Sequence, residues 1–457
     1  MEYIRKKIGN TVLYNSKVLA NKNNVDNLFF KMEGVNPTGR IQDRLAFALV
    51  KEAIQLGHDS IAVTSLGPLG TSIAYVSEIT EMDCYIYIPK GSRDKKNKWY
   101  QMPHVKLVET GKNYKQAFEQ CQKDANENNW YNANPGYENI SITTTVYSEI
   151  SHEIVRKLGK NPDNIFIYMA NGSVLLGLHH GFRELWYRGV IDRIPTIFTG
   201  CTETNHKLLD AFKKGKRNID EAYTTAFSKK TLTRNNVNYM VVDPQGVLNS
   251  IYDSGGHILE IDEIDVKENV KEIYKAEKIK VFPRGCLAYM TFKKANKLGL
   301  IKEDDTNVII LEEGKAAIEV KVLSEENFDS LDTIVNYTMK YLGEYGDDKV
   351  STKEAVEYAS KNGFIIGAFL DNSISGIAVV IRMPLKIVLP EYHLVYIGTD
   401  LRKGSRGIGT HLMKKIHELT GGNFSLHVDL QNKKAIRVYE KMGLKKSYIR
   451  MINYPEE

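Results

Sequence analysis

The sequence predicts two α/β domains in succession, a large one on a twisted parallel sheet and a smaller one on a mixed sheet. Its 457 residues exceed what one ordinary hydrophobic core supports, so we expect more than one domain. From residue 28 to about 315, short apolar runs alternate with amphipathic helical stretches, and beyond that point the pattern changes. We therefore expect one domain at 1–316 and a second at 317–457.

Six short apolar runs in the first region indicate buried strands. They are IAVTS (61–65), CYIYIP (84–89), KLVET (106–110), IFIYMA (165–170), PTIFTG (195–200) and NVIIL (307–311). Amphipathic stretches at 44–57 and 146–159 indicate helices between them. Strands that alternate with helices form crossover units, which predicts a parallel sheet covered by helices on both faces.

The second region has a different order of elements. FIIGAFL (364–370) and ISGIAVVIRM (374–383) flank a polar turn and predict an antiparallel hairpin, followed by a strand at 392–398. A helix at 410–419, a strand at 424–430 and a helix at 433–443 complete the pattern. This order predicts a mixed sheet.

The composition is that of a soluble globular protein, with 42% hydrophobic and 26% charged residues. No apolar run approaches the ~20 residues that span a bilayer, and MEYIRKKIGN (1–10) lacks the apolar segment of a secretory signal. We therefore expect a cytoplasmic protein with no membrane partner.

The cysteines and the net charge limit the kinds of ligand. The four cysteines lie far apart without a CxxC pair, which disfavours a zinc site or a disulfide framework. A formal charge of +6 suits anionic ligands. The lysines are spread along the chain without a concentrated basic stripe, so we expect no nucleic-acid partner.

The segment RKGSRGIGTHLM (402–413) joins a strand to a helix and is rich in glycine. Glycine lets the backbone approach an anion closely, and the first amides of a helix are unpaired and positively polarised. Such a turn suits a pyrophosphate, although a glycine-rich turn before a helix is often only a turn. The candidate binding residues are Arg402, Gly404, Arg406, Gly407, Ile408, Gly409 and Thr410.

The following segment, HVDLQNKKAIRVYEKMGLKK (427–446), resembles the closing signature of GNAT-type N-acetyltransferases. The match covers Asn432, Ala435, Ile436, Tyr439, Glu440, Lys441 and Gly443. The resemblance implies a GNAT-like domain that binds acetyl-CoA, or another acyl-CoA, where two strands splay. It also implies that an amine attacks the thioester directly.

The same resemblance implies roles for two side chains. Tyr439 matches the tyrosine that protonates the leaving thiolate, and a ring that only packs on the sheet is the alternative. Asn432 matches the asparagine near the thiol arm of CoA and can also be a helix N-cap. Gly404 departs from the family, which has Gln or Arg there. No general base stands out, because each candidate also suits a structural role: Glu344, Glu391, His393 and Asp400.

The first region contains six further motifs: IGNTVL (8–13), LFFKMEGVNPTGRIQDRLAF (28–47), TSLGPLGTSIAY (64–75), ANGSVLLGLHHGF (170–182), NSIYDSGGHILEID (249–262) and FPRGCLAYM (282–290). Together they resemble fold-type II pyridoxal-phosphate (PLP) enzymes, with threonine synthase and cysteine synthase as the nearest relatives by motif. The resemblance implies the twisted parallel sheets of that fold, with PLP as the family's cofactor. By analogy we also expect a homodimer.

Four departures from that family put PLP chemistry in doubt. Gln42 stands where the family has the lysine of the Schiff base, and a carboxamide is not nucleophilic toward an aldehyde. Pro68 replaces the asparagine that hydrogen-bonds the ring hydroxyl, and Glu312-Glu313 replaces the Thr-Gly pair that faces the pyridine nitrogen. The phosphate cradle has become Ala170-Asn171-Gly172-Ser173, whose amides can still bind an anion. The altered site comprises Gln42, Ser65, Gly67, Asn171, Gly172 and Ser173.

The sequence therefore predicts an acetyl-CoA-dependent N-acyltransferase that acts on a small amine or amino-acid derivative. Its PLP-like domain would be catalytically silent and would bind an amino acid or phosphate, or act as a scaffold. One alternative is PLP-dependent elimination or replacement on an amino acid, with Gln42 a substituted lysine. Another is a metabolite-binding protein without turnover. His179 and His180 are adjacent on a helix and do not face one site, so we expect no metal there.

Overall fold

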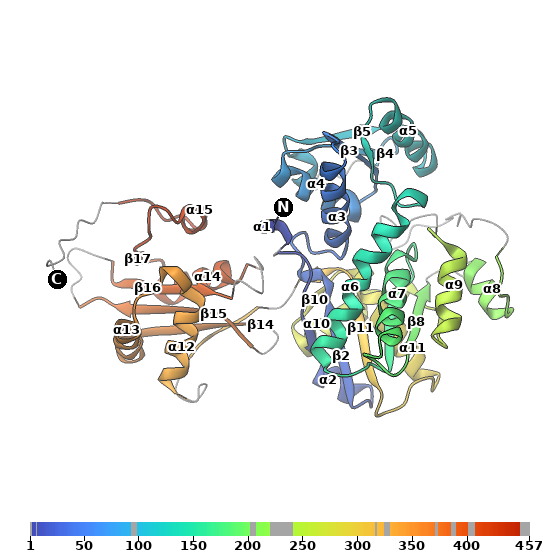
Figure 1. Cartoon of the computed structure of the whole chain (residues 1–457). Coiled ribbons are helices and arrows are strands. Elements are labelled where there is room, and N and C mark those ends of the chain that lie inside the picture. Colours follow the sequence, from blue (N-terminus) through green and yellow to red (C-terminus); the bar gives the residue numbers. More distant parts are fainter. Residues whose placement is uncertain are drawn as a thin grey trace. The chain divides into compact units, whose positions relative to one another are not determined.

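A computed structural model describes residues 2–5, 7–92, 98–201, 207–219, 241–315, 318–323, 330–370, 373–384, 390–400 and 407–447. The chain divides into two compact units, Met1–Ala317 and Ile318–Glu457 (Figure 1). Within the described part of the chain, no helix is long and apolar enough to cross a membrane.

The N-terminal unit contains a six-stranded sheet in the order β1-β2-β11-β7-β8-β9. All neighbouring strands are parallel except β1, which pairs antiparallel with β2. The strands are β1 (Leu13–Asn15), β2 (Asn27–Met32), β7 (Asn164–Tyr168), β8 (Thr196–Cys201), β9 (His257–Glu260) and β11 (Thr306–Leu311). The helices that accompany this sheet are α2 (Lys17–Lys22), α6 (Ile140–Leu158), α7 (Ser173–Tyr187), α8 (Lys207–Lys213), α9 (Pro244–Asp253), α10 (Val266–Glu277) and α11 (Pro283–Lys297).

A second sheet of four parallel strands has the order β5-β4-β3-β6. Its strands are β3 (Ser60–Thr64), β4 (Asp83–Ile88), β5 (Val105–Glu109) and β6 (Tyr131–Asn132), and its helices are α3 (Gln42–Gln55), α4 (Pro68–Thr80) and α5 (Tyr114–Glu127). The unit also has α1 (Glu2–Arg5) and a short antiparallel pair, β10 (Lys280–Val281) with β12 (Gly314–Lys315). The six strands predicted from apolar runs are confirmed, as is their parallel arrangement.

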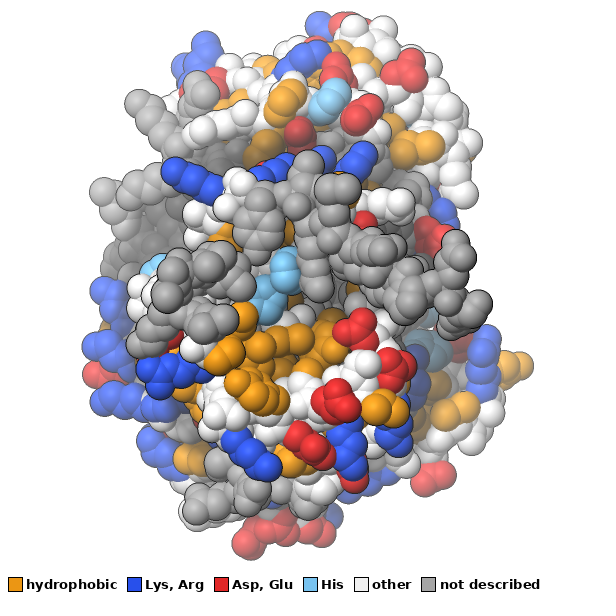
Figure 2. All heavy atoms as spheres, turned by 90° about the vertical axis from the view of Figure 1, so that its left-hand side faces the viewer, with side chains coloured by type: hydrophobic (Ala, Val, Ile, Leu, Met, Phe, Trp, Pro, Cys, Tyr) orange, Lys and Arg blue, Asp and Glu red, His pale blue; other side chains and the backbone are white. Residues whose placement is uncertain are grey.

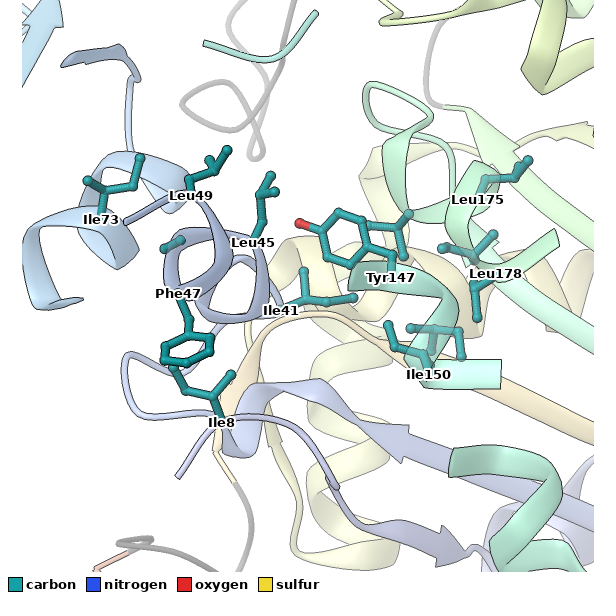
Figure 3. Close-up of a cluster of buried hydrophobic side chains, with 14 of the residues drawn as sticks. Ile8, Ile41, Leu45, Phe47, Leu49, Ile73, Tyr147, Ile150, Leu175 and Leu178 are labelled. Atoms are coloured by element: carbon teal, nitrogen blue, oxygen red, sulfur yellow. The ribbon is translucent and has the colours of Figure 1, made fainter. Parts of the chain in front are cut away.

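Alternate residues of β7 face different helices. Ile165 and Ile167 belong to the apolar cluster of α6 and α7, whereas the ring of Phe166 lies 5.3 Å from that of Phe292 on α11. Because successive side chains of a strand point to opposite faces, helices cover both faces of the sheet, as the sequence predicts. Figure 3 shows part of the first cluster, in which Tyr147 of α6 lies between Leu45 of α3 and Leu178 of α7.

A buried network of four charges joins β2, α3 and α6. Arg44 and Lys31 each contact both Glu33 and Glu153, at distances of 2.6 to 3.1 Å. Although burial opposes it, Arg44 and Lys31 lower the pKa of Glu33 to about 2. The two positive and two negative charges balance, which is the condition under which ions tolerate burial.

The C-terminal unit contains a five-stranded sheet in the order β13-β14-β15-β16-β17. The strands are β13 (Glu319–Val322), β14 (Gly363–Leu370), β15 (Ser373–Arg382), β16 (Tyr392–Thr399) and β17 (Phe424–Leu426), and only β16 and β17 pair in parallel. The mixed sheet and the hairpin of β14 and β15 are confirmed.

The helices of this unit divide between the two faces of its sheet. They are α12 (Leu331–Leu342), α13 (Lys349–Asn362), α14 (Ile408–Thr420) and α15 (Lys433–Lys441). Ile334 of α12 and Val356 of α13 pack in one apolar cluster with Val379, while Leu412 of α14 packs in a second cluster with Val380. We call these the α13 face and the α14 face.

Candidate functional site

The strands β16 and β17 pair over only three residues each. The pairs are Tyr392 with Phe424, His393 with Ser425, and Leu394 with Leu426, whereas β16 continues to Thr399 along β15. Beyond Leu394, this edge of β16 therefore has no strand partner among the described residues. We call this place the β16–β17 opening.

A β-bulge lies at the start of the opening. On β15, Val379 faces Tyr396 and the next residue, Val380, faces Leu394, so Val395 has no partner in the register. A bulge of this kind kinks its strand and re-aims backbone groups, and such bulges are frequent next to active sites.

The helix α14 begins at a glycine with a left-handed backbone. Gly407 is its N-cap, with φ of 78°, and accepts a hydrogen bond from the backbone N–H of His411. The first amides of α14, at Ile408, Gly409 and Thr410, form a positively polarised helix end as predicted for an anion site. Three of the predicted contacts lie outside the described residues, namely Arg402, Gly404 and Arg406.

The helix α15 carries the two residues of the predicted acyl-CoA site that follow the glycine-rich turn. Asn432 caps the helix, because its Oδ1 accepts a hydrogen bond of 3.1 Å from the N–H of Ala435. Tyr439 is half-buried on the α14 face, where it packs with Leu426 against the apolar cluster. Burial raises the pKa of Tyr439, so its phenol stays protonated at neutral pH and can act as a proton donor.

Polar side chains gather on the α13 face at the opening. Tyr392 and Leu394 face the α14 cluster, so His393 between them points to the α13 face. Its Nδ1 lies 2.9 Å from Oγ of Ser425 on β17, and its ring centroid lies 4.6 Å from that of His427. Figure 2, seen from the side of this unit, shows histidine side chains beside a hydrophobic surface that acidic side chains border.

An acidic group lies on the same face, beside Tyr396 of β16. The hydroxyl of Tyr396 donates a hydrogen bond of 2.6 Å to Oδ2 of Asp347, which precedes α13 and is exposed. Burial and this carboxylate raise the pKa of Tyr396. The α13 face therefore offers imidazole nitrogens and a carboxylate, which suit a cationic amine.

The other candidates for a general base have structural surroundings. Glu391 forms an ion pair with Arg382, with Oε1 2.7 Å from Nη2. Asp400 is buried, and its backbone N–H donates to the carbonyl of Ser375. The side chain of Glu344 lies outside the described residues. His427 is absent from the residues that the sequence pattern singles out, because only the register of β17 against β16 brings it next to His393.

Five of the six altered PLP-like residues of the N-terminal unit line one cavity, and Gly172 does not. The cavity measures about 50 Å³, and the first turns of four helices, α3, α4, α7 and α11, contribute to its wall. Its lining residues include Gln42, Ser65, Gly67, Pro68, Tyr147, Asn171, Ser173 and Arg284. Among the described residues, no lysine lines it.

The turn before α7 has a left-handed backbone at two residues, and two of its amides already donate within the turn: the N–H of Gly172 to the carbonyl of Met169, and the N–H of Ser173 to Oδ1 of Asn171. Ala170 and Gly172 are both left-handed, with φ of 44° and 81°. A Cβ on Gly172 would lie 2.5 Å from Cγ2 of Val247, so only glycine fits there. Across the cavity, Oγ of Ser65 accepts hydrogen bonds from the amides of Gly67 and Gly70 and fixes the entry to α4.

A buried charge cluster backs the cavity wall. Nε of Arg284 lies 3.3 Å from Oε2 of Glu312, and its Nη1 lies 3.8 Å from Oε1 of Glu313. Burial raises the pKa of Glu312 to about 7, although Arg284 opposes the shift. Arg284 does not stand out in the motif FPRG, because only the fold brings it to residues 42 and 312.

Two other predictions concern residues away from the cavities. His179 contacts Asp253, with Nε2 2.7 Å from Oδ2, which is a structural pairing as predicted. All four cysteines are buried free thiols: Cys84, Cys121, Cys201 and Cys286.

Comparison with known families matches both regions of the chain. Residues 4–313 match the family described as pyridoxal-phosphate dependent enzyme. The chain belongs to this family. Residues 331–444 match the acetyltransferase (GNAT) family, so the chain consists of a PLP-enzyme domain followed by a GNAT domain. The two resemblances that the motifs indicate are thereby confirmed.

Curated relatives of the PLP-enzyme domain include threonine synthases. The enzyme of Methanocaldococcus jannaschii is 26% identical over 307 residues, which cover 66% of this chain and 73% of the relative. The enzyme of Methanosarcina acetivorans is 24% identical over 306 residues, with the same shares of each chain.

Solved structures share the fold of the PLP-enzyme domain. Threonine deaminase isoform 2 from Solanum lycopersicum superposes with a TM-score of 0.57 at 14% identity, covering 68% of this chain and 86% of that one. Cysteine synthase from Entamoeba histolytica gives a TM-score of 0.53 at 16% identity, covering 78% and 95%.

Proposed function

We propose that this protein transfers an acyl group from acyl-CoA to a small amine or amino-acid derivative in its GNAT domain. The observation that carries this proposal is the β16–β17 opening, which has polar groups on both faces. Tyr439 lies on the α14 face, and His393 with His427 lies on the α13 face. A proton donor and a proton acceptor thus lie on the two faces of the sheet at the opening, and direct attack of an amine on a thioester uses both.

In this proposal, the first amides of α14 hold the CoA pyrophosphate. Gly407 permits the left-handed backbone from which the helix starts, and the helix end favours a doubly charged group. Asn432 fixes the first turn of α15 and thereby the position of Tyr439.

The amine attacks the carbonyl carbon of the thioester, the C–S bond breaks, and Tyr439 protonates the departing thiolate. Its raised pKa suits a donor that must remain protonated until the sulfur becomes basic.

The amine must lose a proton before or during the attack. We assign this task to the His393–His427 pair, in which Ser425 holds the ring of His393. His427 is exposed and can pass the proton to water. Asp347 beside Tyr396 favours an acceptor that arrives as a cation.

The PLP-enzyme domain carries no Schiff-base chemistry in this proposal. A Schiff base needs a primary amine, and the lining offers the carboxamide of Gln42 instead. The lining therefore does not fit the cofactor of the family.

One observation favours a second candidate function, PLP-dependent elimination or replacement on an amino acid. The turn at Ala170 and Gly172 keeps the left-handed conformation of an anion cradle. An absorbance band in the aldimine region, formed by the wild-type chain with added PLP and lost on borohydride treatment, would establish this candidate. We expect no such band.

The acyltransferase proposal is tested by thiol release from acetyl-CoA with a panel of amino acids and polyamines. We expect release above background with at least one amine class. If the chain binds acetyl-CoA and releases no thiol with any amine, it is a binding module and the proposal is wrong.

A matched pair of glycines tests the pyrophosphate site. Gly407 and Gly421 are left-handed and cap opposite ends of α14, and a Cβ would be uncrowded at either one. Both substitutions to valine strain the backbone, but only Gly407→Val would remove acetyl-CoA affinity in calorimetry. Equal affinities in the two variants would count against this site.

A further inference from the structure

The cavity of the PLP-enzyme domain has the electrostatics of an anion site. Gln42 and Ser173 are the first residues of α3 and α7, Pro68 is the first of α4, and Arg284 is the second of α11. Each of these helices has at least 13 residues, and each N-terminal end carries a partial positive charge. Four such ends around one cavity favour a negatively charged group inside it.

An unsatisfied acceptor lines the same cavity. Gln42 is 8% exposed, and its buried Oε1 has no hydrogen-bond partner among the residues that the structure describes. A buried amide oxygen without a donor is costly, and such groups in proteins usually meet a ligand or an ordered water. The cavity therefore favours a ligand that combines an anionic group with an N–H or O–H donor.

Negative charge close to Gln42 favours a charged donor. The backbone N–H of Ile41 donates to the carbonyl of Glu312, which places the Glu312 residue next to the start of α3. Glu312 and Glu313 both contact the guanidinium of Arg284. Two carboxyl groups beside one guanidinium favour a further positive charge nearby, such as an ammonium group.

The size of the cavity limits the ligand. The cavity volume is about 50 Å³, which favours a small ligand such as glycine, alanine or serine.

We propose that this cavity binds a small free α-amino acid without a covalent bond, in the space that the family uses for its cofactor. The ammonium group donates to Oε1 of Gln42, and the carboxylate faces the first turns of α7 and α4. No bond to the protein forms or breaks.

Titration calorimetry of the full chain tests the proposal with glycine, L-alanine, L-serine, PLP and inorganic phosphate as separate ligands. We expect saturable binding of at least one of the three amino acids and weaker or no binding of PLP and phosphate. Binding of PLP or phosphate without any of the amino acids would overturn the proposal, as would the absence of all binding. The titration contains no acyl-CoA, and loss of binding in the Gln42→Leu variant distinguishes this cavity from the amine site proposed for the GNAT domain.

Variants of Gln42 test the orientation of the ligand. Gln42→Leu removes the acceptor at similar size, and we expect affinity to fall about tenfold or more. Gln42→Glu keeps the acceptor and adds charge, so amino-acid affinity should be kept or increased. Loss of binding in Gln42→Glu would mean that the carboxylate faces residue 42, and the proposed orientation would be wrong.

A control on the same helix separates binding from folding. Gln55→Leu changes the exposed last residue of α3 and should leave both affinity and thermal unfolding unchanged. If Gln55→Leu lowers affinity as much as Gln42→Leu, the loss reflects the helix and not the cavity, and the proposed contact fails.

Discussion

The N-terminal cavity and the β16–β17 opening differ in what each of them retains. At the cavity, four helices begin around one space, but its described lining has no amine for a Schiff base. The opening has the phenol of Tyr439 on one face and the imidazoles of His393 and His427 on the other, beside a kinked strand. This difference teaches that the shape of a binding cavity is more robust than its reactive group. The topology and packing of many residues maintain the cavity, whereas one substitution removes the reactive group.

The largest expected effect concerns the stability of the PLP-enzyme domain, whose packing maintains the cavity. Glu153→Gln leaves Arg44 and Lys31 with one buried carboxylate instead of two. An uncompensated buried charge costs about 3–5 kcal/mol, so the urea concentration at the midpoint of unfolding of this domain should fall strongly. Glu119→Gln, at an exposed pair with Lys115, should cost less than about 1 kcal/mol. Similar shifts of the urea midpoint in the two variants would show that the charge network does not stabilise this domain.

The next effect concerns the proposed proton donor of the GNAT domain. Tyr439→Phe keeps the ring that packs on the α14 face but removes the proton donor. We expect kcat for thiol release to fall about 100-fold while thermal unfolding stays unchanged. An unaltered kcat would mean that Tyr439 only packs.

A smaller effect concerns the pH dependence of stability in the N-terminal domain. Burial raises the pKa of Glu312 from 4.5 to about 7. A carboxyl group with a raised pKa stabilises the folded state fully below pH 4.5, and this contribution is lost as the pH rises through about 7. The loss is on the order of 3 kcal/mol or less.

Glu312→Gln should therefore flatten the decline in stability between about pH 5 and about pH 8. Urea midpoints of the variant and the wild type at both pH values measure the difference. Parallel declines would assign the pH dependence to other groups, such as Asp43, whose pKa burial raises to about 6.

The smallest effect concerns the proton acceptor. His427→Gln removes the exposed member of the histidine pair, and we expect kcat to fall about tenfold, because His393 and Ser425 remain. His417→Gln in the last turn of α14 is the control and should leave kcat unchanged. If both variants keep full kcat, another group takes the proton.

The sequence predicts much of the fold because local patterns carry it. Apolar runs of five or six residues mark the parallel strands, and the Asn432 cap follows from its place before the motif helix. Contacts between distant residues are not encoded locally. Arg284 reaches Glu312 through the pairing of the sheet, and His427 reaches His393 through a register that residues 424–426 alone do not specify.

The unpaired Val395 makes the GNAT domain sensitive to the deletion of one residue. Leu394 and Ile397 pack on the α14 face and Tyr396 on the α13 face, so a strand without residue 395 would still alternate correctly. Deleting this one codon would straighten β16 at the loss of a single half-buried side chain. Substitutions at this position should be tolerated, whereas a deletion should silence acyl transfer in a chain that still folds. For this strand, the number of residues matters more than their identity.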